Sequence, residues 1–115
     1  MLRGDLHHHF NADPVDGVFV QHSIGELIDR AAACGINVLA VTCHEAIPYD
    51  GDATRYAAER GVILLRGMEA TVGSEHVLLI NFREFPQGKC TMADIAAAKD
   101  PGALVIAPHP FYPLG

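Results

Sequence analysis

Histidine is the residue type whose placement in this sequence carries most chemical information. The chain has 115 residues, and its seven histidines are His7, His8, His9, His22, His44, His76 and His109. His7 and His9 are two positions apart, and side chains at this spacing point to the same face of an extended strand. Two imidazoles on one face can bind one divalent metal ion, and neutral imidazole suits Zn, Fe and Mn. For each histidine taken alone, a hydrogen-bonded structural role is the alternative interpretation.

Glu69 adds a carboxylate to this set of imidazoles. A carboxylate can bridge two metal ions that are held by histidines, and a water shared by such ions becomes a strong nucleophile for hydrolysis. This chemistry requires that residues far apart in the sequence meet at one place. The elements that carry them must therefore end at a common edge of the fold.

The sequence alternates between strand-like and helix-like segments. Ser23 and Glu26 form a capping box that predicts the start of a helix, and Gly35 suits its end. We expect helices at about residues 24–34, 52–60 and 91–99, and strands at about residues 3–9, 36–42, 62–65, 76–82 and 103–107. This alternation predicts an α/β fold with a largely parallel sheet.

In such folds the ligands bind beyond the carboxyl ends of the parallel strands. The first expected strand ends in His7 and His9, the second is followed by His44, and the third by Glu69. His109 follows the last strand. His76 instead starts its strand, so it reaches the same rim only if that strand or its preceding turn runs back along the mouth. The joint placement of these residues predicts a metal site.

Six short motifs in this order carry a resemblance to a known family. They are Asp5-Leu6-His7-His8-His9, Ser23-Ile24-Gly25-Glu26-Leu27-Ile28, Ala40-Val41-Thr42-Cys43-His44-Glu45, Gly67-Met68-Glu69, His76-Val77-Leu78-Leu79 and Pro108-His109-Pro110. The sequence resembles the polymerase and histidinol phosphatase (PHP) family of metal-dependent phosphoesterases. The resemblance implies an α/β fold of the irregular, TIM-like β/α barrel type, with seven strands in the family and about the first five in this chain.

The resemblance also implies two to three divalent metal ions (Mn, Fe or Zn) that hydrolyse phosphate esters through a metal-bridging hydroxide. The first ion would be held by His7, His9 and Glu69, which are the expected catalytic residues. Glu69 would bridge to a second ion, whose other ligands would be His76 and His109. A third would be held by His44 and an acidic residue of the 11–17 loop, with Asp16 as the first choice and Asp13 as the competing one. Asp5 would orient a ligand imidazole.

The sequence departs from the family pattern at two places. Cys43 stands where the family has an aspartate, and we expect its thiol to pack in the core. The late Asp-x-His motif of the family is missing, so we expect a single domain over residues 1–115 that is truncated at its C-terminus. The alternative is that another chain, such as a second copy in a homo-oligomer, completes the exposed sheet.

The composition limits the classes of partner. The chain has 14 acidic and 8 basic residues, which give a net charge of −6, and half of its residues are apolar. This acidic balance disfavours nucleic acid as a partner. The resemblance implies a small phosphorylated substrate, for which Arg3, Arg55 and Arg66 are candidate phosphate clamps. The apolar stretches are too short to cross a membrane, no secretory signal is recognised, and we expect a cytoplasmic protein with reduced cysteines. A non-catalytic metal-binding module and a nuclease are the competing functions.

Overall fold

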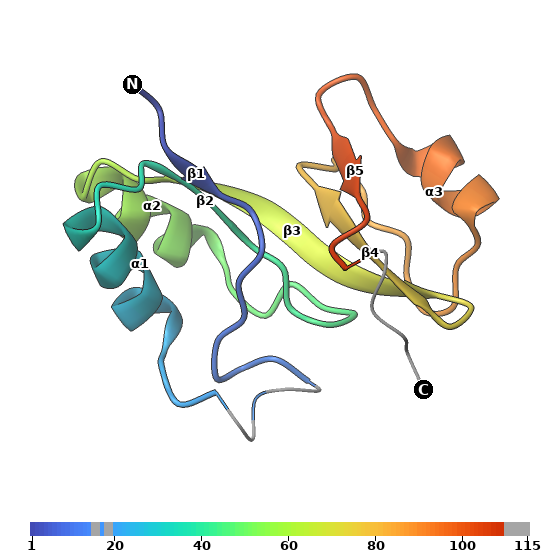
Figure 1. The fold of residues 1–115 in the computed structure, drawn as a ribbon, viewed down its shortest axis with the longest axis horizontal. Coiled ribbons are helices and arrows are strands. Elements are labelled where there is room, and N and C mark those ends of the chain that lie inside the picture. Colours follow the sequence, from blue (N-terminus) through green and yellow to red (C-terminus); the bar gives the residue numbers. More distant parts are fainter. Residues whose placement is uncertain (15–16, 18–19, 110–115) are drawn as a thin grey trace.

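The computed structural model of the chain describes residues 1–14, 17 and 20–109, and five strands and three helices are found among them (Figure 1). In chain order these are β1 (Gly4–Asp5), α1 (Ile24–Ala33), β2 (Val38–Val41), α2 (Gly51–Glu59), β3 (Ile63–Val72), β4 (Glu75–Ile80), α3 (Met92–Ala98) and β5 (Leu104–Ile106). The strands form one sheet in the order β1-β2-β3-β4-β5. The sheet curls into a half-barrel, which agrees with the expected partial barrel.

The sheet is mixed, so the expectation of a largely parallel sheet is wrong. β1, β2 and β3 pair in parallel, whereas β4 is antiparallel to both β3 and β5. The cause is the two-residue connection Gly73-Ser74, in which Gly73 takes a positive φ of 62°. A connection this short can join only antiparallel strands, and glycine adopts positive φ without steric cost. β5 consequently runs in the same direction as β3.

The predicted helices are present, and their ends follow the sequence signals. Ser23 caps α1 and accepts from the backbone N–H of Glu26, while the Glu26 side chain accepts from the backbone N–H of Ser23. Gly35 follows the helix with a φ of 77°. Thr91 and Asp94 form the same reciprocal box at the start of α3. These caps satisfy backbone groups that a helix terminus leaves without partners.

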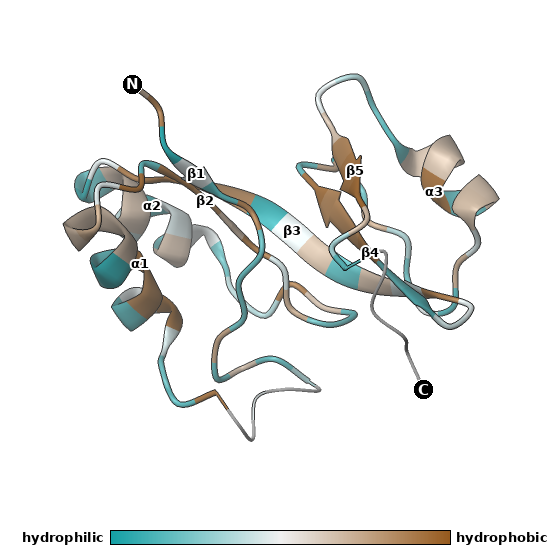
Figure 2. Ribbon diagram, in the orientation of Figure 1, coloured by the Kyte–Doolittle hydropathy of each residue, from teal (hydrophilic) through white to brown (hydrophobic). Residues whose placement is uncertain are grey.

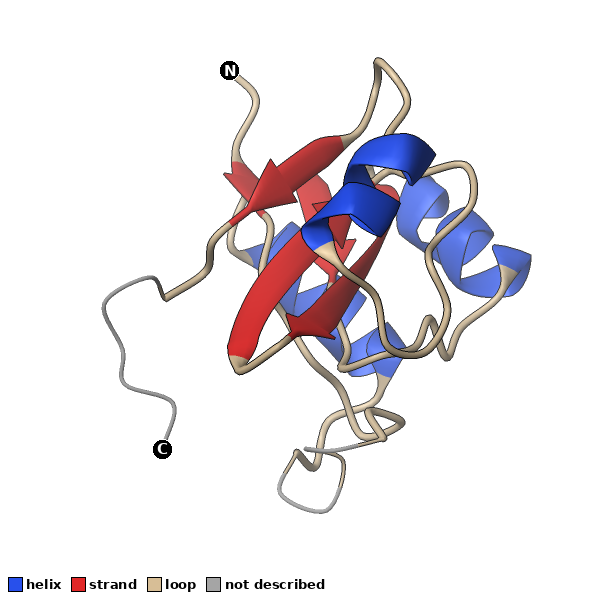
Figure 3. Cartoon of the chain, turned by 90° about the vertical axis from the view of Figure 1, so that its right-hand side faces the viewer, coloured by secondary structure: helices blue, strands red, loops and turns tan. Residues whose placement is uncertain are grey.

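The helices cover the outer face of the sheet, and alternate strand residues point to the inner face. Leu39, Val41 and Leu64 pack with α1 and α2 in one cluster. A second cluster contains residues of β3, β4 and β5 together with α3, and a third, on the inner face, contains Ala40, Leu78 and Ile80. Figure 3 shows α3 and the α1–α2 pair over different parts of the sheet. In Figure 2, β2, β4 and β5 are largely apolar, whereas hydrophilic bands interrupt β3.

β3 is the strand that connects the two halves of the sheet. Its first half pairs with β2 and its second half with β4. At Gly67, where the partner changes, an added Cβ would lie 2.8 Å from Thr42 Cγ2 and 3.1 Å from the Val41 carbonyl oxygen. Glycine therefore permits the close approach of β2 and β3 two residues before Glu69. No helix in the described ranges is long and apolar enough to cross a membrane.

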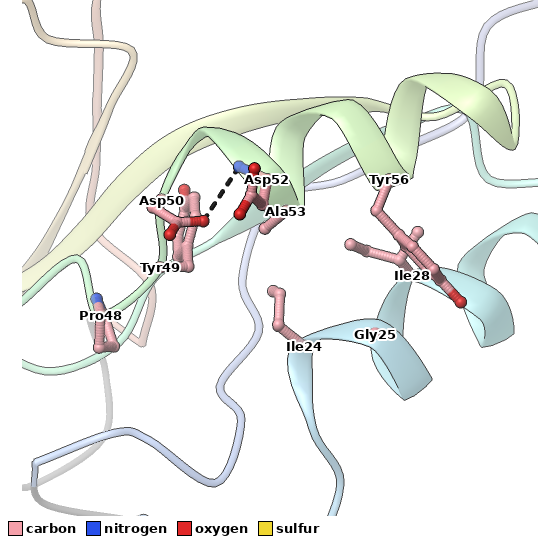
Figure 4. A pocket seen from close by; sticks show the side chains of 9 residues that line it. All are labelled: Ile24, Gly25, Ile28, Pro48, Tyr49, Asp50, Asp52, Ala53 and Tyr56. Carbon is pink, nitrogen blue, oxygen red and sulfur yellow. Dashed lines mark hydrogen bonds between the residues drawn. The ribbon is translucent and has the colours of Figure 1, made fainter.

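A groove of about 630 Å³ lies between α1 and α2 (Figure 4). Its walls include Ile24 and Ile28 of α1 and Tyr56 of α2, and Asp50 at its rim caps α2 by accepting from the backbone N–H of Asp52 at 3.0 Å. None of the residues that line this groove belongs to the histidine set. The groove is thus separate from the predicted metal site.

Candidate metal site

Five histidines and two carboxylates gather at one rim of the half-barrel, where β1, β2, β3 and β5 end and β4 begins. The residues are His7, His9, Asp13, His44, Glu69, His76 and His109, and each contacts at least one of the others. They come from six segments of the chain. The antiparallel β4 explains how His76 reaches this rim although it lies near the start of its strand.

Glu69 lies at the centre of the cluster, and its side chain is 2% exposed. One carboxylate oxygen, Oε1, is 2.6 Å from His7 Nε2 and 3.4 Å from His9 Nε2. The other oxygen, Oε2, is 2.7 Å from His44 Nε2 and 2.8 Å from His76 Nδ1. Each oxygen therefore faces its own pair of imidazoles.

Strand pairing sets the positions of His44 and His76 relative to Glu69. His44 and Glu69 form a parallel bridge, in which Glu69 N donates to the Cys43 carbonyl and Glu45 N donates to the Glu69 carbonyl. Glu45 then takes a φ of 56°, which turns the chain away from the sheet. In the hairpin Glu69 is opposite Leu78, so His76 is its diagonal neighbour on the same face.

His7 and His9 point into the cluster together, but they lie beyond β1, which ends at Asp5 and not at residue 9 as expected. Their Nε2 atoms are 3.3 Å apart. His8 points elsewhere and contacts Asp5, with 2.7 Å between His8 Nε2 and Asp5 Oδ2. The expectation that Asp5 orients a ligand imidazole is thus not met, because its carboxylate is paired with the one histidine of the three that faces away.

Asp13, and not Asp5, contacts an imidazole of the cluster. Its Oδ2 accepts from His9 Nδ1 at 2.6 Å and from the backbone N–H of His44 at 2.9 Å. Both of its carboxylate oxygens also lie 3.3 Å from His44 Nδ1. The side chain is fully buried. A carboxylate that accepts from Nδ1–H of His9 fixes the tautomer in which Nε2 is free to bind a metal ion.

His76 and His109 lie at the open side of the cluster. His109 Nε2 is 3.4 Å from His76 Nδ1, and the centroids of the His109 and His7 rings are 6.4 Å apart. His109 therefore joins the cluster through His76. The assignment of His109 as a ligand of a second ion stays a prediction.

The donor atoms are arranged in a way that fits divalent metal ions. Three sets of three donors lie within 4.8 Å of one another, namely His7-His9-Glu69, His9-Asp13-His44 and His44-Glu69-His76. In the first set the atoms are 2.6 to 3.4 Å apart. Ligands about 2.1 Å from one ion are separated by about 3.0 Å in octahedral and about 3.4 Å in tetrahedral geometry. The two distances from His9 Nε2, 3.3 and 3.4 Å, match the edges of a coordination shell, whereas the 2.6 Å between His7 and Glu69 is that of a hydrogen bond.

These sets agree in part with the expected ligand groups. The first is the predicted His7, His9 and Glu69. The set His44-Glu69-His76 has His44 where we expected His109, and the set His9-Asp13-His44 contains Asp13, the competing choice for the loop ligand. Asp16, the first choice for the loop ligand, lies outside the described residues.

The candidate phosphate clamps lie away from the cluster. Arg55 pairs with Asp52 on the surface of α2. Arg66 stands over the Phe85 ring, and it is three positions from Glu69 in the same strand, which puts it on the opposite face of the sheet. Arg3 lies near Gly35, at the opposite end of β1 from His7. None of the three candidate arginines therefore lies at the cluster.

Cys43 packs in the core, as expected, and is 1% exposed. It is a member of the cluster that contains Phe10 and Val41. All three cysteines are free.

Hydrogen bonds raise the pKa of His9 to about 10, against the opposing effect of burial. The largest of these effects comes from the Cys43 thiol, followed by Glu69 and Asp13. For Glu69, burial acts to raise the pKa, but the hydrogen bonds from His7 and His9 outweigh it and hold the pKa well below its usual range.

These shifts predict how the stability of the metal-free protein depends on pH. The contribution of Glu69 is present above its ordinary pKa of 4.5 and is lost as the pH falls below it. The contribution of His9 is complete below its ordinary pKa of 6.5 and declines as the pH rises toward about 10. We therefore expect chelator-treated protein to be most stable between pH 4.5 and 6.5. Urea unfolding at a series of pH values measures this.

The matched variant for this measurement is His9→Gln, in which the decline above pH 6.5 should be smaller. Protons and metal ions compete for the same nitrogen atoms, so added metal should raise the melting temperature more at pH 8 than at pH 6. A wild-type stability that increases steadily from pH 6.5 to pH 9 would contradict the proposed charge state of the cluster.

Comparisons with known proteins give two relatives by sequence and two similar solved structures. No protein-family model matches the sequence. The chain is 28% identical to an uncharacterized protein of Methanocaldococcus jannaschii, over 98% of this chain and 70% of that protein. It is 39% identical over 82 residues to a 5'-3' exoribonuclease of Haemophilus influenzae, a match that covers 68% of this chain and 28% of the exoribonuclease.

Solved structures with a similar fold are larger proteins. An amidohydrolase from Chromobacterium violaceum, determined with bound sulfate and no metal, matches 70% of this chain with a TM-score of 0.58 and 31% identity. A protein from Bifidobacterium adolescentis that has been assigned as a metal-dependent phosphoesterase matches the same share with a TM-score of 0.58 and 23% identity, which shows the fold alone. The chain spans 28% of the length of each. The chain therefore shares its fold with part of each of these larger proteins.

Proposed function

We propose that this chain carries the metal centre of a divalent-metal-dependent phosphoesterase of the PHP type. The observation that carries the proposal is Glu69, whose two buried carboxylate oxygens face separate pairs of imidazoles at 2.6 to 3.4 Å. A carboxylate placed in this way suits a bridge between two cations. Bound divalent ions would activate a water and neutralise charge on the phosphoryl oxygens.

The residues of the chain contribute position and orientation to this chemistry. His7, His9 and Glu69 would hold one ion, and Glu69 with His44 and His76 would hold another. Asp13 holds the His9 ring through Nδ1, so that His9 Nε2 faces the cluster. His7 and His76 are 35% and 25% exposed at the side chain, whereas Glu69 is buried below them. Substrate would therefore approach from the side of His7 and His76.

The names of similar proteins support phosphate esters more than amides as substrates. The relative with the higher sequence identity is an exoribonuclease, which cleaves phosphodiesters, and one structural neighbour has been assigned as a phosphoesterase. The exoribonuclease favours a nucleotide substrate as a second candidate, although the net charge of −6 opposes binding to long nucleic acids. Manganese, zinc and iron all suit this mixed donor set.

The test is hydrolysis by protein that has been stripped with a chelator and then supplied with Mn²⁺, Zn²⁺ or Fe²⁺. The substrates are p-nitrophenyl phosphate, its bis-ester and a p-nitroanilide, which represent monoesters, diesters and amides. Metal-dependent cleavage of either ester supports the proposal. Metal binding without cleavage of any substrate would support the alternative of a non-catalytic metal-binding module. If the wild type binds no divalent metal, the proposal is wrong.

A further inference from the structure

His22 lies outside the metal cluster, but its ring contacts the backbone of a cluster residue, His9. Its Nε2 donates to the carbonyl oxygen of His9 at 2.7 Å. Its own carbonyl accepts from the backbone N–H of Asn11 at 2.9 Å. His22 thus makes two hydrogen bonds to the segment that begins at His9, one through its ring and one through its carbonyl oxygen.

The sheet supplies few hydrogen bonds to the backbone of this segment. β1 ends at Asp5, so His7 and His9 lie beyond the regular strand. Beyond β1, Thr42 N donates to the His8 carbonyl at 2.7 Å. The next carbonyl, that of His9, is held by His22. A side chain therefore continues the hydrogen bonding where the regular pairing of β1 with β2 has ended.

The position of His22 is itself fixed by helix α1. His22 directly precedes Ser23, which caps the helix in a capping box with Glu26. The helix is anchored in the core by Leu27 and Ile28, which are 7% and 0% exposed. The geometry connects a rigid element to a short segment that contains both His9 and Asp13, and these two side chains contact each other at 2.6 Å.

We infer that His22 is a positioning residue for the metal centre, which holds the His9–Asp13 segment to the start of α1 so that the His9 ring faces Glu69. This inference rests on the proposed function, because it takes His9 to be a metal ligand. Its donor role does not require charge, since an imidazole with a proton on Nε2 donates in either protonation state. Residues that orient metal ligands through hydrogen bonds typically affect metal affinity about 10- to 100-fold.

The test compares His22→Gln with His22→Met. The two side chains have similar length and shape, but only the glutamine amide can donate to the His9 carbonyl. Zn²⁺ affinity is measured by competition with a chromogenic chelator, and urea unfolding of the metal-free proteins is measured in parallel. We expect His22→Gln to remain within about threefold of the wild type and His22→Met to bind Zn²⁺ at least about tenfold more weakly. His8→Ala, which removes a half-buried histidine whose ring contacts Asp5 outside the cluster, is the control.

The outcomes separate this inference from the proposed function. If the wild type does not bind Zn²⁺, the proposed function fails. If the wild type binds Zn²⁺ and both His22 variants bind it equally well, the positioning role is wrong and the proposed function stands. A merely structural role would lower the stability of His22→Met without metal while leaving its Zn²⁺ affinity equal to that of His22→Gln, and this result would also overturn the inference.

Discussion

Replacing Glu69 with Gln is expected to abolish metal-dependent hydrolysis, with a fall in rate of about a thousandfold or more. The substitution keeps the size of the side chain but removes the negative charge that faces four imidazoles. The amide N–H groups of the glutamine would also point at imidazole nitrogens whose lone pairs a metal ion requires. Elemental analysis should show a loss of bound metal in parallel with the loss of activity.

The same substitution should destabilise the metal-free protein below pH 6.5, where His9 is protonated. Removing one partner of a buried charge pair costs about 3 kcal/mol or more, because the other charge remains without compensation. Glu45→Gln is the matched control, since Glu45 lies on the same rim, is exposed, and accepts from the backbone N–H of Thr71 through an oxygen that glutamine retains. A Glu69→Gln protein with the metal content and rate of the wild type would exclude the proposed bridging role.

Asp13→Asn is expected to have the next largest effect, a loss of metal affinity of about 10- to 100-fold. The carboxylate holds the His9 ring, the His44 ring and the His44 backbone at once. An asparagine keeps one acceptor oxygen, but its amide nitrogen would face at least one of these partners. Competition with a chelator measures the affinity, and the melting temperature of the metal-free variant shows whether the fold is retained.

The control for this variant is Asp29→Asn on α1. Asp29 accepts from Tyr56 and Arg60 on the surface and has no contact with the cluster. The result bears on the choice between Asp13 and Asp16 as the loop ligand. Full affinity in Asp13→Asn together with a large loss in Asp16→Asn would transfer the role to Asp16.

The alternation of polar and apolar residues predicts most of this fold, because the signals are local. The reciprocal caps at Ser23 and Thr91 and the glycine at position 35 depend on residues within one helical turn, and the structure contains all of them. The direction of β4 was predictable in the same way, since a Gly-Ser pair between two apolar runs is a hairpin signal. With the third strand expected to end at residue 65, the Gly-Ser pair has no role in the predicted fold.

The pairing of acids with histidines was harder to predict because it depends on loops. Asp5 and Asp13 are both close to His9 in the sequence, and spacing alone does not show which carboxylate reaches the ring. In the structure Asp5 contacts His8 instead. Asp13 reaches His9 because the chain turns after His9, with Asp13 N donating to the Phe10 carbonyl at 3.0 Å. The spacing of the histidines also does not indicate the contact of His22, because its partner is a backbone carbonyl.

The cluster joins side chains from near the two ends of the described chain, with His7 and His109 only 6.4 Å apart between ring centroids. The β3–β4 hairpin, in contrast, is closed by two residues and can form early in folding. Bringing the ends together costs more loop entropy, so we expect the cluster to assemble late. Interactions that form after the transition state slow unfolding rather than accelerate folding. A bound metal would thus act on this protein mainly by prolonging the lifetime of the folded state.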